Sequence, residues 1–147
     1  MKAKAKDFFN KEERSEIKKA ILNAELDTSG EIRVYIENDC NGDVLDRASY
    51  LFKKLNMEKT DLDNGVLFYL AIVSKKFAII GDTGINKEVP KDFWKEIKDS
   101  MAKQFEAGEF TEGLTSGIAK AGVRLKKHFP HHIDDINELS DDISFGD

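Results

Sequence analysis

The sequence contains little cysteine and no long apolar run. Cys40 is its only cysteine, which excludes an intramolecular disulfide and is compatible with a reducing compartment. The longest unbroken apolar stretch, residues 66–73, is far shorter than the roughly 20 residues that cross a bilayer. Residues 1–6 contain three lysines, but residues 7–12 are mostly polar, so the apolar core of an export signal is missing. We therefore expect a cytoplasmic protein without a transmembrane segment.

Positive charge is also scarce. The chain has 23 Lys and Arg against 28 Asp and Glu, a net charge of −5. Residues 131–147 contain no Lys or Arg and six acids: Asp134, Asp135, Glu138, Asp141, Asp142 and Asp147. Subtracting this −6 from −5 leaves +1 for residues 1–130. Neither part has the basic footprint of a nucleic-acid-binding protein, so we expect no nucleic-acid partner.

The acidic C-terminal stretch is nevertheless too apolar for a disordered, solvent-exposed segment, because it also contains Ile133, Ile136, Leu139, Ile143 and Phe145. At 147 residues the chain is long enough for one domain with a substantial core. We predict a domain over residues 1–130 and a tail over residues 131–147 that packs on it. The alternative is that the tail docks on a protein partner. The sequence does not determine the oligomeric state.

Two periodicities appear in residues 1–130. Apolar residues at helical spacing predict about four helices: residues 11–25, a helix capped by Asp43, one opened by Pro90 and ended by Gly108, and one capped by Thr111. Residues 31–37 alternate between polar and apolar, and residues 66–73 and 77–80 are two apolar runs rich in β-branched and aromatic residues. These patterns predict three strands, the last two joined as a hairpin.

The predicted connections determine which residues share an edge of the sheet. Strand, helix and strand within about forty residues form a crossover that makes the first two strands parallel. The hairpin then returns its second strand to the start of its first. The following polar residues should therefore meet at one edge: Glu31, Asp61, Asp63, Asn64 and Asp82. Crowded carboxylates repel each other unless a cation or hydrogen-bond donors compensate them.

The sequence around this edge resembles the TPM domain family, which has long been catalogued as a domain of unknown function. Residues 63–67 with the apolar run behind them, residues 28–34, residues 81–85 and residues 105–114 carry the resemblance, which spans about residues 11–129. It implies a three-layer α/β/α sandwich with a small mixed sheet. It also implies acid phosphatase activity, calcium binding at Asp61, Asp63, Asn64 and Asp82, or a role in the assembly and repair of membrane protein complexes.

Two interpretations of the acidic edge stay open from the residues alone. Asp, Asn and Glu oxygens suit Ca²⁺ or Mg²⁺, and the resemblance favours Ca²⁺. Alternatively, residues 63–65 and 82–84 are ordinary turn chemistry beside strands. Neither a Cys-x₅-Arg motif nor an Asp-x-Asp-x-Thr/Val motif is present, so hydrolysis would need a metal-activated water, with Arg33 or Lys59 assisting. The function hypotheses are therefore a metal-dependent phosphatase-like hydrolase and a non-enzymatic interaction module that supports a partner protein or complex.

Overall fold

The protein forms a four-stranded mixed sheet. The structure is a computed structural model that describes residues 5–26, 28–57, 64–90, 92–130 and 143–146. The sheet order is β3-β2-β1-β4, with β1 at Glu31–Glu37, β2 at Gly65–Ala71, β3 at Lys76–Gly81 and β4 at Ser144–Phe145. Strands β1 and β2 are parallel, whereas β2 and β3 are antiparallel. The predicted crossover and hairpin are thus confirmed.

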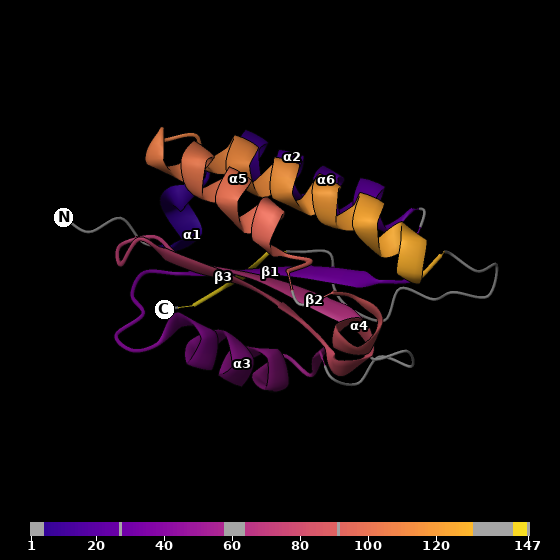
Figure 1. Ribbon diagram of the computed structural model, residues 1–147. Helices are drawn as coiled ribbons and strands as arrows, with labels where there is room; N and C mark the ends of the chain where they lie inside the picture. Colours follow the sequence, from indigo (N-terminus) through magenta and orange to yellow (C-terminus); the bar gives the residue numbers. More distant parts are fainter. Residues whose placement is uncertain (1–4, 27, 58–63, 91, 131–142, 147) are drawn as a thin grey trace.

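Helices cover both faces of this sheet, as the α/β/α prediction requires. The helices of the described residues are α1 at Ala5–Phe8, α2 at Lys11–Glu25, α3 at Val44–Lys54, α4 at Thr83–Glu88, α5 at Lys95–Glu106 and α6 at Phe110–His128. Helices α2, α5 and α6 lie on one face, and α3 lies on the other (Figure 1). The fold class is therefore confirmed. None of the helices described is long and apolar enough to cross a membrane.

Local signals determined several boundaries directly. Helix α2 spans the predicted residues because Asn10 and Glu13 form a capping box: the side chain of Asn10 accepts from the Glu13 amide at 2.8 Å, and the side chain of Glu13 accepts from the Asn10 amide at 3.0 Å. Asp43 caps α3 by accepting from the amides of Leu45 and Asp46. The cap at Asp43 was predicted from the sequence.

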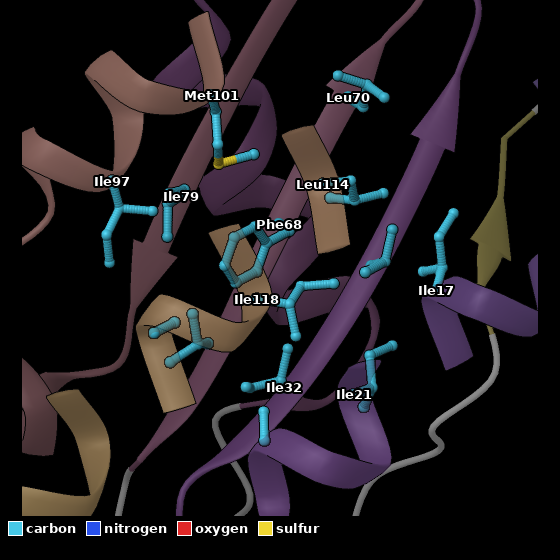
Figure 2. Close-up of a cluster of buried hydrophobic side chains, with 14 of the residues drawn as sticks. Ile17, Ile21, Ile32, Phe68, Leu70, Ile79, Ile97, Met101, Leu114 and Ile118 are labelled. Atoms are coloured by element: carbon cyan, nitrogen blue, oxygen red, sulfur yellow. The ribbon is translucent and has the colours of Figure 1, made fainter. Parts of the chain in front are cut away.

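The main core lies between the sheet and the three-helix layer. Figure 2 shows side chains from the strands, including Ile32, Phe68 and Ile79, facing residues of the helices such as Met101 and Ile118. A second buried cluster, around Leu51, Phe52 and Tyr69, lies between the sheet and α3. Strand β2 is buried on both faces, which explains why its sequence is a continuous apolar run.

Three glycines of α6 allow its neighbours to approach closely. A Cβ at Gly113 would lie 2.7 Å from Phe105, one at Gly117 would lie 2.5 Å from Met101, and one at Gly122 would lie 2.7 Å from the Cβ of Ala24. Glycine lowers helix propensity, yet α6 is continuous here. Packing therefore offsets the weaker propensity, and α2 and α5 both contact α6 closely.

The structure corrects some expectations. Pro90 does not open a helix: its carbonyl accepts from the Phe93 amide at 3.1 Å, forming a turn, and α5 begins five residues later at Lys95. The predicted turn after β3 instead starts the short helix α4, because Asp82 caps it. Leu45, in the first turn of α3, is 49% exposed, and the buried residues of this helix lie further along it.

The described part of the tail joins the sheet. Strand β4 pairs in parallel with β1, Ser144 opposite Tyr35 and Phe145 opposite Ile36. Ile143 and Phe145 pack against the main core. Residues 131–142 lie outside the described part of the chain, so the boundary of the predicted tail stays a prediction.

Candidate functional site

The starts of β1 and β2 and the end of β3 lie at one edge of the sheet, which we call the acidic rim. Glu31 is opposite Gly65, and Val66 is opposite Gly81. The Glu31 amide donates to the Asn64 carbonyl at 3.3 Å, and the Asp82 amide donates to the Gly65 carbonyl at 2.9 Å. Three of the five residues predicted for the cation site, Glu31, Asn64 and Asp82, therefore share this rim.

These three polar residues are buried, with exposed fractions of 4% for Glu31, 2% for Asn64 and 7% for Asp82. Buried polar groups are costly unless they are hydrogen-bonded. The Asn64 amide group donates to the Ser29 carbonyl at 3.1 Å and approaches the Ser29 hydroxyl at 3.4 Å. Asn64 thus ties the loop before β2 to the loop before β1.

Asp82 has a structural task as well. Its Oδ1 accepts from the Thr83 amide at 2.7 Å, which caps α4. Helix capping therefore accounts for one side-chain oxygen of Asp82, and the contact with Ser29 accounts for the amide group of Asn64. Asn64 and Asp82 therefore have structural roles at the rim besides being candidate cation ligands.

The rest of the predicted site lies beyond the described structure. Asp61 and Asp63, the two other proposed carboxylates, and Lys59 fall within residues 58–63, outside the described residues. Among the residues that are described, no group of three or more His, Cys, Asp or Glu side chains is arranged to hold a metal ion. A complete cation site at the rim would therefore need the loop that carries Asp61 and Asp63.

Arg33 was predicted from the sequence to assist metal-dependent hydrolysis at the acidic rim. Its Nε donates to the Ser144 hydroxyl at 3.1 Å, on the outer side of β1. Burial lowers the pKa of its guanidinium, although an arginine remains charged at neutral pH. In this arrangement Arg33 anchors the tail strand rather than the acidic rim.

A second polar cluster, which was not predicted from the sequence, lies at the opposite end of the sheet. Glu37, 5% exposed, accepts from Arg47 in a bidentate pair, Nε to Oε2 and Nη2 to Oε1, both at 2.8 Å. The Tyr69 hydroxyl also donates to Oε2 of Glu37. In the sequence, this cluster shows only as a glutamate at the end of a strand and an arginine ten residues later. That pattern is too general to predict the pairing.

The pKa values of this cluster reflect its pairing. Burial by itself would raise the pKa of Glu37, but hydrogen bonds from Arg47 and Tyr69 and the positive charges of Arg47 and Lys54 outweigh it, so the pKa lies below the ordinary value. Hydrogen bonding to Glu37 raises the pKa of Arg47. Burial and the bond to Glu37 raise the pKa of Tyr69. At neutral pH the cluster is an ion pair with a neutral phenol, which suits a structural role.

Cys40 lies near this second cluster. It is buried, its amide donates to the Ser74 hydroxyl at 2.8 Å, and its thiol points to the Gly42 carbonyl at 3.6 Å. Lys76 also donates to the carbonyls of Cys40 and Gly42, at 3.1 and 3.0 Å. These contacts hold the loop after β1 against the hairpin.

The surface also has a more apolar hollow, away from the acidic rim. It has a volume of about 550 Å³ and lies between the turn of the hairpin and α5, with Leu70, Phe77, Ala102 and Phe105 among its lining residues. It lies near the end of β2 and the start of β3, whereas the rim is at the other ends of these strands. The hollow and the acidic rim are therefore two separate features at opposite ends of β2 and β3.

Comparison with known proteins adds the family. The family model described as TPM domain matches residues 3–124. The solved structure of BA42 protein from the psychrophilic bacterium Bizionia argentinensis is 48% identical, with a TM-score of 0.89 over 95% of this chain and 96% of that chain. No curated protein matches the chain.

Two further solved structures show the same fold. The N-terminal domain of a protein from P. gingivalis has a TM-score of 0.67 at 17% identity, over 84% of this chain and 82% of that chain. The N-terminal domain of cg2496 protein from Corynebacterium glutamicum has a TM-score of 0.64 at 12% identity, over 80% and 74%. Since the family model covers most of the chain and agrees with the observed fold, the protein belongs to the TPM domain family.

Proposed function

We propose that this protein binds a divalent cation, Ca²⁺ in preference to Mg²⁺, at the acidic rim. Glu31 and Asp82 would supply carboxylate oxygens and Asn64 a carbonyl oxygen, with Asp61 and Asp63 completing the ligands from the preceding loop. The observation that supports the proposal is the burial of Glu31, Asn64 and Asp82 at one end of three adjacent strands. Buried carboxylates are stabilised by a nearby positive charge.

The donor set fits a hard cation. Ca²⁺ takes six to eight oxygen ligands in a flexible geometry, drawn from carboxylates, amide and backbone carbonyls and water. Glu31, Asn64 and Asp82 alone are too few, which is why the proposal depends on Asp61 and Asp63. Mg²⁺ demands a tighter octahedral shell, a requirement that a site built from a loop and three strand ends meets less readily.

A bound cation would also supply chemistry: it polarises a phosphoryl oxygen and lowers the pKa of a bound water. Metal-dependent hydrolysis of phosphomonoesters is therefore the activity that the proposed site would support. Arg33 is engaged with Ser144, so stabilisation of a phosphoryl group by this chain would fall to Lys59. If hydrolysis is absent, the cation site serves a non-enzymatic interaction module.

Calorimetric titration of the full chain with Ca²⁺ and with Mg²⁺ tests the cation site. We expect saturable Ca²⁺ binding to the wild type, weaker Mg²⁺ binding, and a loss of affinity of about tenfold or more in Asp63→Asn, because the charge count of the ligands tunes affinity. Asp46→Asn is the matched control, since Asp46 is an exposed acid on α3 away from the rim. No saturable binding by the wild type, or equal affinities for Asp63→Asn and Asp46→Asn, would refute the proposal.

A phosphomonoesterase assay with p-nitrophenyl phosphate, with and without added Ca²⁺, then separates the two functions. Turnover that needs the cation and disappears in Asp63→Asn, while Asp46→Asn keeps it, identifies a hydrolase. Intact Ca²⁺ binding without turnover identifies the interaction module. Circular dichroism of each variant checks that the fold is retained, because Asp63 directly precedes the rim residue Asn64 in the sequence.

A further inference from the structure

The tail strand occupies the outer edge of β1 in a way that defines a strand-binding site. Besides the pairing of β4 with β1, the Gly146 amide donates to the Ile36 carbonyl at 2.7 Å, and Arg33 donates to the Ser144 hydroxyl at 3.1 Å. Main-chain bonds of this kind provide affinity without specifying a sequence, whereas alternate side chains in pockets provide specificity. Both elements are present at this edge.

Specificity at this edge comes from a glycine. A Cβ at position 146 would lie 2.7 Å from the Cβ of Glu37, 2.8 Å from the Tyr35 hydroxyl oxygen and 2.9 Å from Oε1 of Glu37. Glu37 cannot readily move aside, because it is held by Arg47 and Tyr69. Among common residues, only glycine therefore fits at this point of a docked strand.

Charge is the second element of specificity. Next to the docked strand is a hollow of about 400 Å³ lined by Ile143 and Phe145 of the tail and by Lys11, Arg14, Ser15 and Lys18 of α2. The tail that reaches this hollow contains six acids and no Lys or Arg in residues 131–147. The basic side of α2 thus complements an acidic segment with apolar side chains.

The pairing in cis is short. In the described residues β4 pairs with two of the seven residues of β1. Near the start of β1 the Ile32 amide donates to the Glu25 side chain at 2.9 Å, so the accessible edge begins after Ile32. An incoming strand that pairs with more of β1 than the two residues paired with β4 in the described structure would gain additional main-chain bonds, which favours exchange at this edge.

We propose that the edge of β1 from Arg33 to Glu37, together with the basic side of α2, is a docking site for an extended acidic segment of a partner protein. That segment carries an aromatic residue followed by glycine, as in Phe145 and Gly146. The chain's own residues 143–146 occupy the site in cis, and the partner's segment binds by displacing them. This proposal does not depend on the cation site, which is at the other end of β1.

A synthetic peptide with the sequence of residues 139–147 serves as the probe, labelled with fluorescein and titrated with the full-length protein by anisotropy. In the wild type the docked tail competes with the peptide, and the apparent Kd rises as the fraction of vacant sites falls. Gly146→Val ejects the chain's own tail. Gly42→Val is the matched control, since no atom lies within 4 Å of a Cβ at Gly42.

We expect Gly146→Val to bind the peptide at least about tenfold more tightly than the wild type and Gly42→Val, which corresponds to a tail docked for more than about 90% of the time. A peptide that itself carries Gly146→Val should not bind, and binding should weaken as salt screens the basic side of α2. If Gly146→Val does not fold by circular dichroism, Ser144→Pro replaces it, because proline cannot donate to the ladder.

Three results would overturn the proposal. The first is equal peptide affinity of Gly146→Val and Gly42→Val, and the second is equal binding of the native and the valine-containing peptides. The third is a concentration-dependent dimer of the wild type in gel filtration that Gly146→Val abolishes. That result would assign the site to the exchanged tail of a second copy rather than to a partner protein.

Discussion

Replacing Gly122 by alanine tests whether the close contact of α2 and α6 depends on the missing side chain. The new Cβ would lie 2.7 Å from the Cβ of Ala24, 2.9 Å from its Cα and 3.1 Å from its carbonyl oxygen. Ordinary contact begins at 3.4 Å, and the Cβ of Ala24 is fixed to its backbone, so the two helices must separate locally by about 3.4 − 2.7 = 0.7 Å. The Cα and carbonyl of Ala24 belong to the backbone of α2 and cannot rotate away.

Two opposing terms set the magnitude. Alanine is more favourable than glycine in a helix by about 0.8–1.0 kcal/mol, whereas overpacking a well-packed core costs about 1–3 kcal/mol. We expect Gly122→Ala to lower the free energy of unfolding by about 1 kcal/mol, a fall in Tm of about 3–4 °C for a chain of this size. Urea unfolding followed by circular dichroism measures it.

Gly117→Ala is the matched control in the same helix. It gains the same propensity, but its Cβ would meet Sδ of Met101 at 2.5 Å and Cγ at 2.9 Å, and a methionine side chain can adopt other rotamers. We expect Gly117→Ala to be neutral or to stabilise the protein by up to about 1 kcal/mol. If Gly122→Ala is as stable as Gly117→Ala or more so, backbone contact does not limit the approach of α2 and α6.

Three further predictions concern stability. The pKa of Glu37 in the folded state lies below its ordinary value of 4.5, so the stability it contributes is complete above pH 4.5 and is lost as the pH falls below that value; urea unfolding between pH 3 and 7 should show a smaller acid loss in Glu37→Gln, and superimposable profiles would contradict this. Asn10→Ala should cost about 1 kcal/mol by removing the cap that binds the Glu13 amide, and an unchanged urea midpoint would show that the cap is unimportant. Asn64→Ala should cost about 1–3 kcal/mol because it leaves the Ser29 carbonyl without this donor; an unchanged thermal midpoint would rule out the tie between the two loops.

The acidic rim shows how far sequence reasoning reaches into a site. The crossover and the hairpin determine strand polarity, and polarity determines which strand ends share an edge. This was enough to predict that Glu31, Asn64 and Asp82 lie at one rim, which the pairing of the strands confirms. Cation binding at that rim stays a prediction, because ligation depends on side-chain directions that strand polarity does not determine and on Asp61 and Asp63, which lie outside the described residues.

The sequence by itself determined the elements whose signals are local: the capped start of α3, the bounds of β1, the buried hairpin and the α/β class. These depend on interactions within a few residues, so they are visible in the order of the residues. Tertiary structure alone decided the contacts between distant segments. The pairing of Glu37 with Arg47 and Tyr69, the approach of Gly122 to Ala24 and the docking of Gly146 over Glu37 each require two segments to meet at a specific distance and orientation. Periodicity cannot specify either quantity, because it describes one element at a time.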